Sequence, residues 1–175
     1  MKNLLRDKTS LKEDIEIALN AQAKMEAEAS SKYLAMASWL ERNGLEKSAD
    51  YLYRQAEEER AHFLKIFRYI NEVGGTAVTP TVGEVPQEYS DLRSVFEAAL
   101  HSEIAVTNAI NRLVGLCRNS NDYATEDFLM WYVTEQREEE KNARRALELF
   151  DLIDVNSSNG LYLLDKEIAK IGGQE

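Results

Sequence analysis

Residues 45–73 read LEKSADYLYRQAEEERAHFLKIFRYINEV, a stretch with the periodicity of a long packed helix. Apolar residues recur in steps of three and four, which is the spacing of one buried helix face. That face comprises Leu45, Ala49, Leu52, Ala56, Glu59, Phe63, Ile66, Ile70 and Val73. A carboxylate, Glu59, therefore stands in the middle of an otherwise apolar face. His62 follows it by three residues and lies on the same side of the helix.

Three further stretches have the same spacing, and each also carries a carboxylate near its midpoint. The three acids are Glu26, Glu103 and Glu139, and Gln136 precedes Glu139 by three residues. The faces are Ile15, Leu19, Gln22, Glu26, Ala29, Tyr33, Met36 and Leu40; Leu92, Phe96, Ala99, Glu103, Val106, Ile110, Leu113 and Cys117; and Leu129, Tyr132, Gln136, Glu139, Ala143, Ala146 and Phe150.

The pattern predicts five helices in one all-α domain that spans residues 1–175. Ser10 with Glu13 has the spacing of a capping box, and Asn43-Gly44 and Gly74-Gly75 supply stops. A breaker run at 156–160 separates the last long helix from a short one. The expected ranges are about 10–42, 45–73, 91–118, 122–151 and 161–170.

The connections between the long helices are unequal, and this predicts the topology. The first and third connections are tight, so each joins an antiparallel pair. Residues 74–89 hold both prolines and extend to roughly 50 Å, whereas a helix of about 28 residues is about 42 Å long. The segment can therefore cross the whole bundle and make the second and third helices parallel. A four-helix bundle with one long crossover is the ferritin-like topology.

Composition excludes several classes of protein. The net charge of −10 argues against a nucleic-acid partner, which requires a basic face. Cys117 is the only cysteine, so no intrachain disulfide or cysteine-based metal site can form, and a reducing cytoplasm is expected. No apolar stretch approaches the about 18 residues that a membrane span needs, and the N-terminus lacks a signal-peptide core.

If the helices pack with their ends aligned, the four acids meet in one buried layer. Several facing carboxylates are unstable unless protons or cations neutralise them, and no Lys or Arg occupies the four faces. Carboxylates with one imidazole suit iron or manganese.

Each of these residues also has a simpler interpretation. His62 alone could be a satisfied interior histidine, and Tyr33 a core tyrosine. The runs 57–59 and 138–140 could be solvated. Trp39 and Trp131 are interpreted as packing residues, and His101 as a surface residue.

Three segments resemble the bacterial non-haem ferritins: EEERAH at 57–62, WYVTEQREEEK at 131–141 and GLYLLDKE at 160–167. The resemblance covers about residues 19–170. It implies a first iron held by Glu26, Glu59 and His62, with Glu59 bridging to a second. It implies that Glu103 and Glu139 bind the second iron, which Gln136 lines. It implies a third iron at Glu58, Glu135 and Glu138, which shares Glu139 with the second. Tyr33 would lie beside the first two irons.

The resemblance also implies a function. Such proteins are ferroxidases that oxidise Fe(II) with O2 or H2O2 and store ferric mineral inside a shell of 24 subunits. Arg60 stands where the haem-binding relatives place a methionine, so no haem is expected. Glu126 falls near the region where animal ferritins line three-fold pores with acids, but Leu129 replaces a second expected acid, so iron entry through that pore is not expected. The alternatives are a rubrerythrin-like diiron peroxidase, against which the lone Cys117 argues, and a metal-free helical interaction protein.

Overall fold

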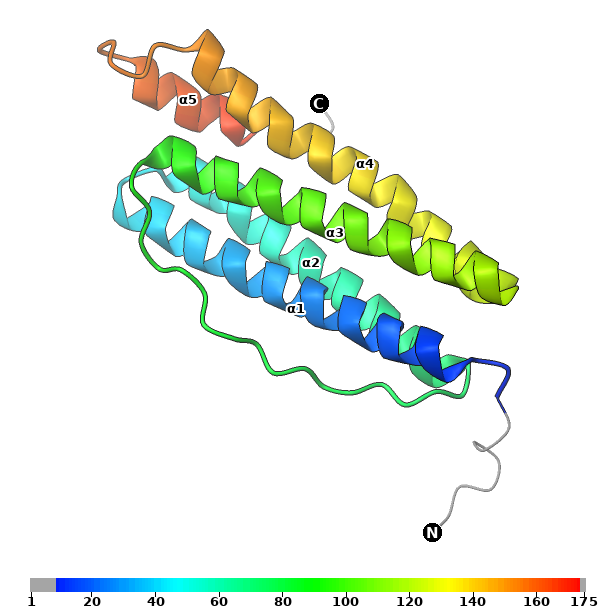
Figure 1. Cartoon of the computed structure of the whole chain (residues 1–175). Coiled ribbons are helices and arrows are strands. Elements are labelled where there is room, and N and C mark those ends of the chain that lie inside the picture. The colour runs from blue at the N-terminus through cyan, green and yellow to red at the C-terminus, as the bar shows by residue number, and fades with distance from the viewer. Residues whose placement is uncertain (1–8, 174–175) are drawn as a thin grey trace.

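The computed structural model describes residues 9–173, and it contains five helices joined by loops (Figure 1). The predicted domain range of 1–175 therefore includes a few terminal residues that lie outside the described part. The helices are α1 (Glu13–Arg42), α2 (Glu46–Glu72), α3 (Leu92–Ser120), α4 (Tyr123–Leu152) and α5 (Gly160–Ile168). Each lies within three residues of its predicted range, and the all-α class is confirmed.

The predicted capping box at the first helix is wrong. Helix α1 begins after Lys12, whose backbone is extended and which provides no side-chain cap. Ser10 lies two residues too early to reach the amides of the first turn. A capping box does begin α3, where Asp91 accepts a hydrogen bond of 2.8 Å from the Ser94 amide and the Ser94 hydroxyl accepts one from the Asp91 amide.

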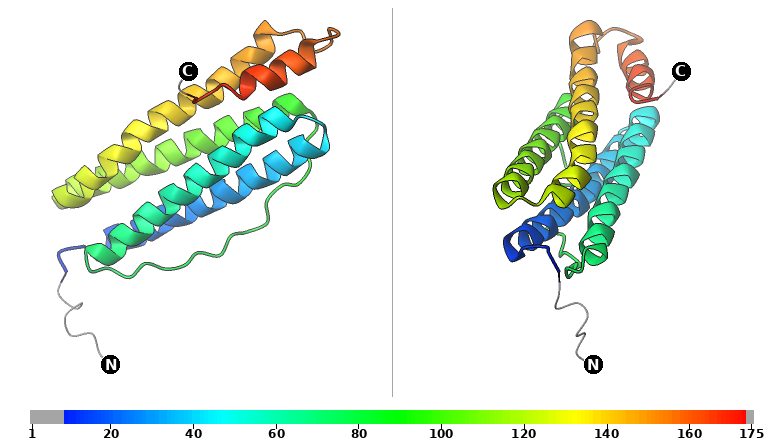
Figure 2. Two further views of the ribbon diagram at one scale, coloured as in Figure 1. Left: turned by 180° about the vertical axis from the view of Figure 1, so that it is seen from behind. Right: turned by 90° about the vertical axis from the view of Figure 1, so that its right-hand side faces the viewer.

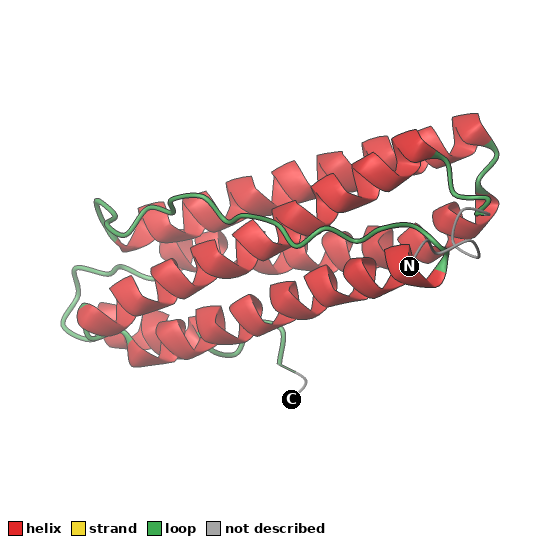
Figure 3. Ribbon diagram, turned by 90° about the horizontal axis from the view of Figure 1, so that it is seen from below, coloured by secondary structure: helices red, strands yellow, loops and turns green. Residues whose placement is uncertain are grey.

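The topology is the predicted bundle with one long crossover. Gly44, with a φ of +77°, turns the chain between α1 and α2, which pack as an antiparallel pair. The segment between α2 and α3 then runs the length of the bundle beside α1, so α2 and α3 point the same way (Figures 1 and 3). Helix α4 packs antiparallel to α3 and completes the bundle.

Polar residues divide the hydrophobic core into two clusters. One cluster, at the end of the bundle near α5, includes Leu40, Leu52 and Phe96. The other, at the opposite end, includes Ile15, Ile70 and Leu129. The four acids that interrupt the apolar faces lie between them and are all buried. The two cores fix the helices on either side of this carboxylate layer, which positions its side chains.

Helix α5 packs against α2 and α4 and closes one end of the bundle (Figure 2). Its Asp165 carboxylate accepts hydrogen bonds from the amides of Ser48, at 2.8 Å, and Lys47, at 3.3 Å. These amides belong to the first turn of α2 and have no partner within that helix, so α5 supplies the cap that α2 lacks. Among the described helices, none has the length and apolar content to cross a membrane.

Gly160 is required where the chain turns from α4 into α5. A Cβ at this position would overlap the carbonyl oxygen of Asp154, which is rigid backbone. We expect Gly160→Ala to destabilise the docked α5 by about 1–3 kcal/mol, measured by hydrogen exchange of the α5 amides. Gly115→Ala is the matched control, because a Cβ there meets open space and should stabilise α3 slightly. Equal exchange rates in both variants would contradict this reading.

Candidate metal centre

Helices α1 and α2 supply one half of the buried carboxylate layer. Ligand atoms of Glu26, Glu59 and His62 lie within 4.8 Å of one another, and all three side chains are buried. His62 stands one turn after Glu59, with Nδ1 3.5 Å from a Glu59 oxygen. The i, i+3 spacing read from the sequence thus places imidazole and carboxylate together on the core side of α2.

Helices α3 and α4 supply the other half. Glu103 is 1% exposed and accepts a hydrogen bond from the Tyr33 hydroxyl, which reaches across from α1. The Gln136 amide nitrogen donates to the same carboxylate at 3.2 Å. Glu139, one turn further along α4, is 6% exposed. The structure therefore brings all four predicted acids into the core together with Tyr33, Gln136 and His62.

Several potential ligand atoms in this layer have no hydrogen-bond partner. A carboxylate oxygen of each of Glu26, Glu59 and Glu139 is buried and unpartnered, as are Nδ1 of His62 and the amide oxygen of Gln136. Five such atoms in one layer carry a large desolvation penalty unless something binds them. All five can coordinate a cation through a lone pair. Oxygen donors with one imidazole and no thiolate fit iron or manganese.

The carboxylates also repel one another. Burial, followed by the neighbouring Glu59, raises the pKa of Glu26 well above its ordinary value. Burial and then Glu103 raise the pKa of Glu59, and burial raises that of Glu103. The pKa of Glu139 rises to about 8, first through burial and then through Glu103 and Glu58. Without a cation the centre therefore holds protons, which a divalent metal would displace.

An acidic pocket of about 520 Å3 connects the centre with the surface between α2 and α4. Glu139 and His62 line it from the centre, and Glu58, Glu135 and Glu138 line it further out. Glu58 and Glu138 are exposed and Glu135 is half-buried, so the interpretation of the acidic runs as partly solvated also holds. Glu58, Glu135 and Glu138 thus line the same pocket as Glu139.

Tyr51 is a residue of this pocket that the sequence analysis missed. It is buried on α2, and its raised pKa reflects burial and then the charge of Glu139. The signal was present in the sequence, because Tyr51, Gln55, Glu58 and His62 follow in steps of three and four along one helix face.

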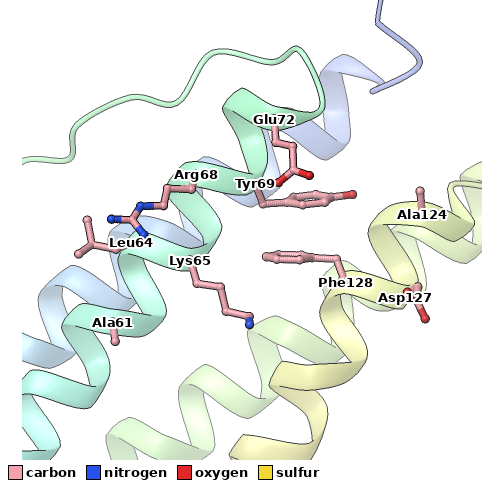
Figure 4. Close-up of a pocket in the computed structure, with 9 residues that line it drawn as sticks. All are labelled: Ala61, Leu64, Lys65, Arg68, Tyr69, Glu72, Ala124, Asp127 and Phe128. Carbon is pink, nitrogen blue, oxygen red and sulfur yellow. The ribbon is translucent and has the colours of Figure 1, made fainter.

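Aromatic rings surround the outer side of His62. The Trp131 ring meets it edge-on at 5.3 Å between centroids, and the Tyr132 hydroxyl donates to the His62 carbonyl oxygen at 2.8 Å. Lys65 lies over Trp131 at 4.0 Å and projects into a separate hollow of about 610 Å3 that is lined by Tyr69 and Phe128 (Figure 4). These contacts fit the packing role predicted for Trp131. His101 is exposed, as predicted.

The Tyr33 hydroxyl should lower the pKa of Glu103 and so strengthen metal binding in the half of the centre around that carboxylate. In Tyr33→Phe, the Glu103 carboxylate loses a buried donor, so its pKa rises further and a metal must compete with a more firmly held proton. We expect binding of the second Fe(II) to weaken about tenfold, measured by anaerobic titration. Tyr53→Phe removes an exposed tyrosine–carboxylate hydrogen bond to Glu41 and is the matched control. Identical isotherms for all three proteins would refute the role.

The fold and the carboxylate layer define a class: four-helix-bundle proteins that hold metal between facing helices, with a Glu from each of two helices and a Glu-x-x-His motif from each of the other two. Here the Glu-x-x-His motif occurs once, at Glu59 and His62, and α4 carries Gln136 where a second such motif would place its first acid. A family model described as a ferritin-like domain matches residues 16–153.

Relatives and solved structures agree with this class. A bacterial non-heme ferritin of Campylobacter jejuni is 36% identical over 92% of this chain and 96% of its own. That of Escherichia coli O6:H1 is 34% identical over 94% and 99%. An open-pore ferritin from the archaeon Archaeoglobus fulgidus is 35% identical over 91% of this chain and 98% of its own, with a TM-score of 0.87. The chain belongs to the bacterial non-haem ferritin family.

Proposed function

We propose that this protein is an iron-storage ferritin with ferroxidase activity. Its substrates are Fe(II) and an oxidant, O2 or H2O2, and its product is ferric iron held as mineral in the cavity of a 24-subunit shell. The observation that carries the proposal is the buried group of Glu26, Glu59 and His62, which faces Glu103 and Glu139 across the core with unpartnered ligand atoms on both sides.

Each residue has a distinct task in this reaction. Glu26, Glu59 and His62 bind one Fe(II), and Glu59 bridges to a second that Glu103 and Glu139 hold. Gln136 offers its unpartnered amide oxygen to the second ion, and this neutral ligand binds it more weakly than a carboxylate would. A weakly held second iron favours release of the product into storage over permanent retention as a cofactor.

The electrons and protons of the reaction balance. Two Fe(II) ions each give one electron to dioxygen, which takes up two protons and leaves as hydrogen peroxide. When hydrogen peroxide is the oxidant, the same two electrons and two protons convert it to two water molecules. The carboxyl groups with raised pKa hold protons before iron binds and release them at the site where reduced oxygen needs them.

The acidic pocket gives Fe(II) a path to the centre. Glu58, Glu135 and Glu138, with Glu139 shared, form a third iron site there in this proposal, and their negative charge attracts cations from solution. The path leads from the surface of α2 and α4 directly to His62 and Glu139.

No haem is involved in this proposal, because Arg60 cannot serve as an axial ligand. A cytoplasmic location accords with the single cysteine.

The test combines oxidation, capacity and size. Purified protein is mixed with Fe(II) in air, the ferric product is followed by its absorbance, and the assembly is sized by gel filtration with metal analysis. The expected result is rapid oxidation of two Fe(II) per subunit, then slower uptake of many more into a particle of 24 subunits. A small oligomer that retains two irons and reduces peroxide would instead favour the rubrerythrin-like alternative. No metal uptake would favour the metal-free interaction protein.

A further inference from the structure

Three hollows in the described chain approach the carboxylate layer from different faces of the bundle. The acidic pocket between α2 and α4 is one. A second hollow, of about 240 Å3 between α3 and α4, is lined by Gln136 together with Arg137, Arg144 and Glu140. The third, the α1–α3 groove, has about 230 Å3 and is lined by residues of α1 and α3 alone. These two helices pack against each other on the side of the bundle away from α2 and α4.

The α1–α3 groove differs from the other two in its chemistry. Six of its eight lining residues are apolar, and the described residues that line it include no carboxylate. They are Ala18, Ala21, Gln22, Met25, Ala109, Arg112, Leu113 and Leu116. Three of the eight residues, Ala18, Ala21 and Ala109, are alanines with small side chains. The single charge is the cationic Arg112, which repels other cations.

Gln22 forms the floor of this groove and belongs to the carboxylate layer as well. Its side chain is buried, and its amide nitrogen donates a hydrogen bond of 2.8 Å to a Glu26 oxygen. The other Glu26 oxygen is unpartnered, and Glu26 belongs to the ligand group with Glu59 and His62. The Gln22 side chain therefore both lines the apolar groove and contacts a residue that would hold the first iron.

We propose that the α1–α3 groove is the route by which dioxygen reaches the centre, with Gln22 as the last residue it passes. This inference rests on the proposed ferroxidase function. Apolar cavities lined by leucine and similar side chains take up small apolar molecules and gases, and dioxygen is one. The second hollow is flanked by two arginines and a glutamate, which hold water rather than an apolar gas.

The same chemistry excludes Fe(II) from the groove and directs it elsewhere. A hydrated divalent cation would lose its water among alanines and leucines and meet Arg112, whereas the acidic pocket offers it carboxylates. The two substrates therefore arrive from opposite faces of the bundle. Dioxygen can reach the iron pair without passing the third iron site, so the two substrates do not compete for one path.

The test uses the double variant Ala21→Leu/Ala109→Leu, which places one larger side chain on the α1 wall of the groove and one on the α3 wall. Ala21 is exposed and Ala109 is half-buried, both on the helix surfaces that line the groove, and leucine is a strong helix former. Iron oxidation is followed by stopped-flow absorbance at saturating Fe(II) and varied dioxygen. We expect kcat/KM for dioxygen to fall at least about threefold, with kcat at saturating dioxygen retained, because access is slowed while the centre is intact.

Three controls isolate the route from damage to the centre. Ala124→Leu places the same substitution in the hollow of Figure 4 and should match the native protein. Anaerobic Fe(II) binding and oxidation by hydrogen peroxide, a polar oxidant, should be unchanged in the double variant. An unchanged kcat/KM for dioxygen overturns the proposal, and so does an equal loss with peroxide. Native protein that oxidises no iron overturns the ferroxidase function and, with it, the route.

Xenon supplies a readout that is independent of iron chemistry. Crystals of the native protein under xenon pressure should show the gas in the α1–α3 groove, and crystals of the double variant should not. A groove that takes up no xenon in the native protein overturns the route even if iron oxidation is rapid.

Discussion

We expect Glu59→Ala to slow the rapid phase of Fe(II) oxidation by at least about 100-fold. Glu59 is 2% exposed and lies in the group with Glu26 and His62, and its pKa responds to Glu103 on the other side of the layer. In the proposed centre it is the acid that bridges the two irons. Its removal leaves each ion one ligand short and ends the control of the distance between them. Stopped-flow absorbance under air measures the effect.

Two variants make this result specific. Glu57→Ala removes an exposed acid two residues away on the same helix and should oxidise iron at the native rate. Glu59→Gln keeps the volume of the side chain but loses its charge, so it should be as slow as Glu59→Ala while folding normally. If Glu59→Ala keeps the native rate, the placement of the iron pair around Glu59 is wrong.

The second large effect concerns the stability of the metal-free protein at alkaline pH. The pKa of Glu139 is raised in the folded state from an ordinary 4.5 to about 8. The folded state therefore binds this proton more tightly than the unfolded state does. The stability that the proton confers is complete below pH 4.5 and is lost as pH rises through 8. Glu26, Glu59 and Glu103 have raised pKa values and act in the same direction.

Glu139→Gln should remove this pH dependence in part. We expect the metal-free variant to match the native protein near pH 4.5 and to exceed its stability near pH 9, by a difference on the order of a few kcal/mol. Thermal unfolding at a series of pH values measures it. Glu138→Gln, an exposed neighbour, is the matched control. Divalent cation should restore the native protein at pH 9 but restore Glu139→Gln less. A difference that does not change with pH would contradict the account.

Periodicity alone predicted the depth of the four acids correctly. Glu26, Glu59, Glu103 and Glu139 each replace an apolar residue in a three-and-four pattern, and a pattern of that length fixes which side of a helix is buried. The crossover was equally predictable, because the length of the second connection allows it to span the bundle. The pattern was less accurate at Phe63, in the body of α2, and at Phe150, near the end of α4, since both are only half-buried.

Contacts between helices could not be read from the sequence. The hydrogen bond from Tyr33 to Glu103 joins α1 to α3, and the Asp165 cap joins α5 to α2. Each depends on how the helices are rotated against one another, which periodicity along a single helix does not determine. The role of Gln22 as the floor of a groove is of the same kind, because the groove exists only between α1 and α3.

The most direct test of the central claim is a crystal soaked anaerobically in Fe(II), with anomalous scattering recorded at the iron edge. We expect two peaks in each subunit. One lies among Glu26, Glu59 and His62, and the other among Glu59, Glu103 and Glu139. A crystal in which these five side chains stay metal-free while iron binds elsewhere would contradict it.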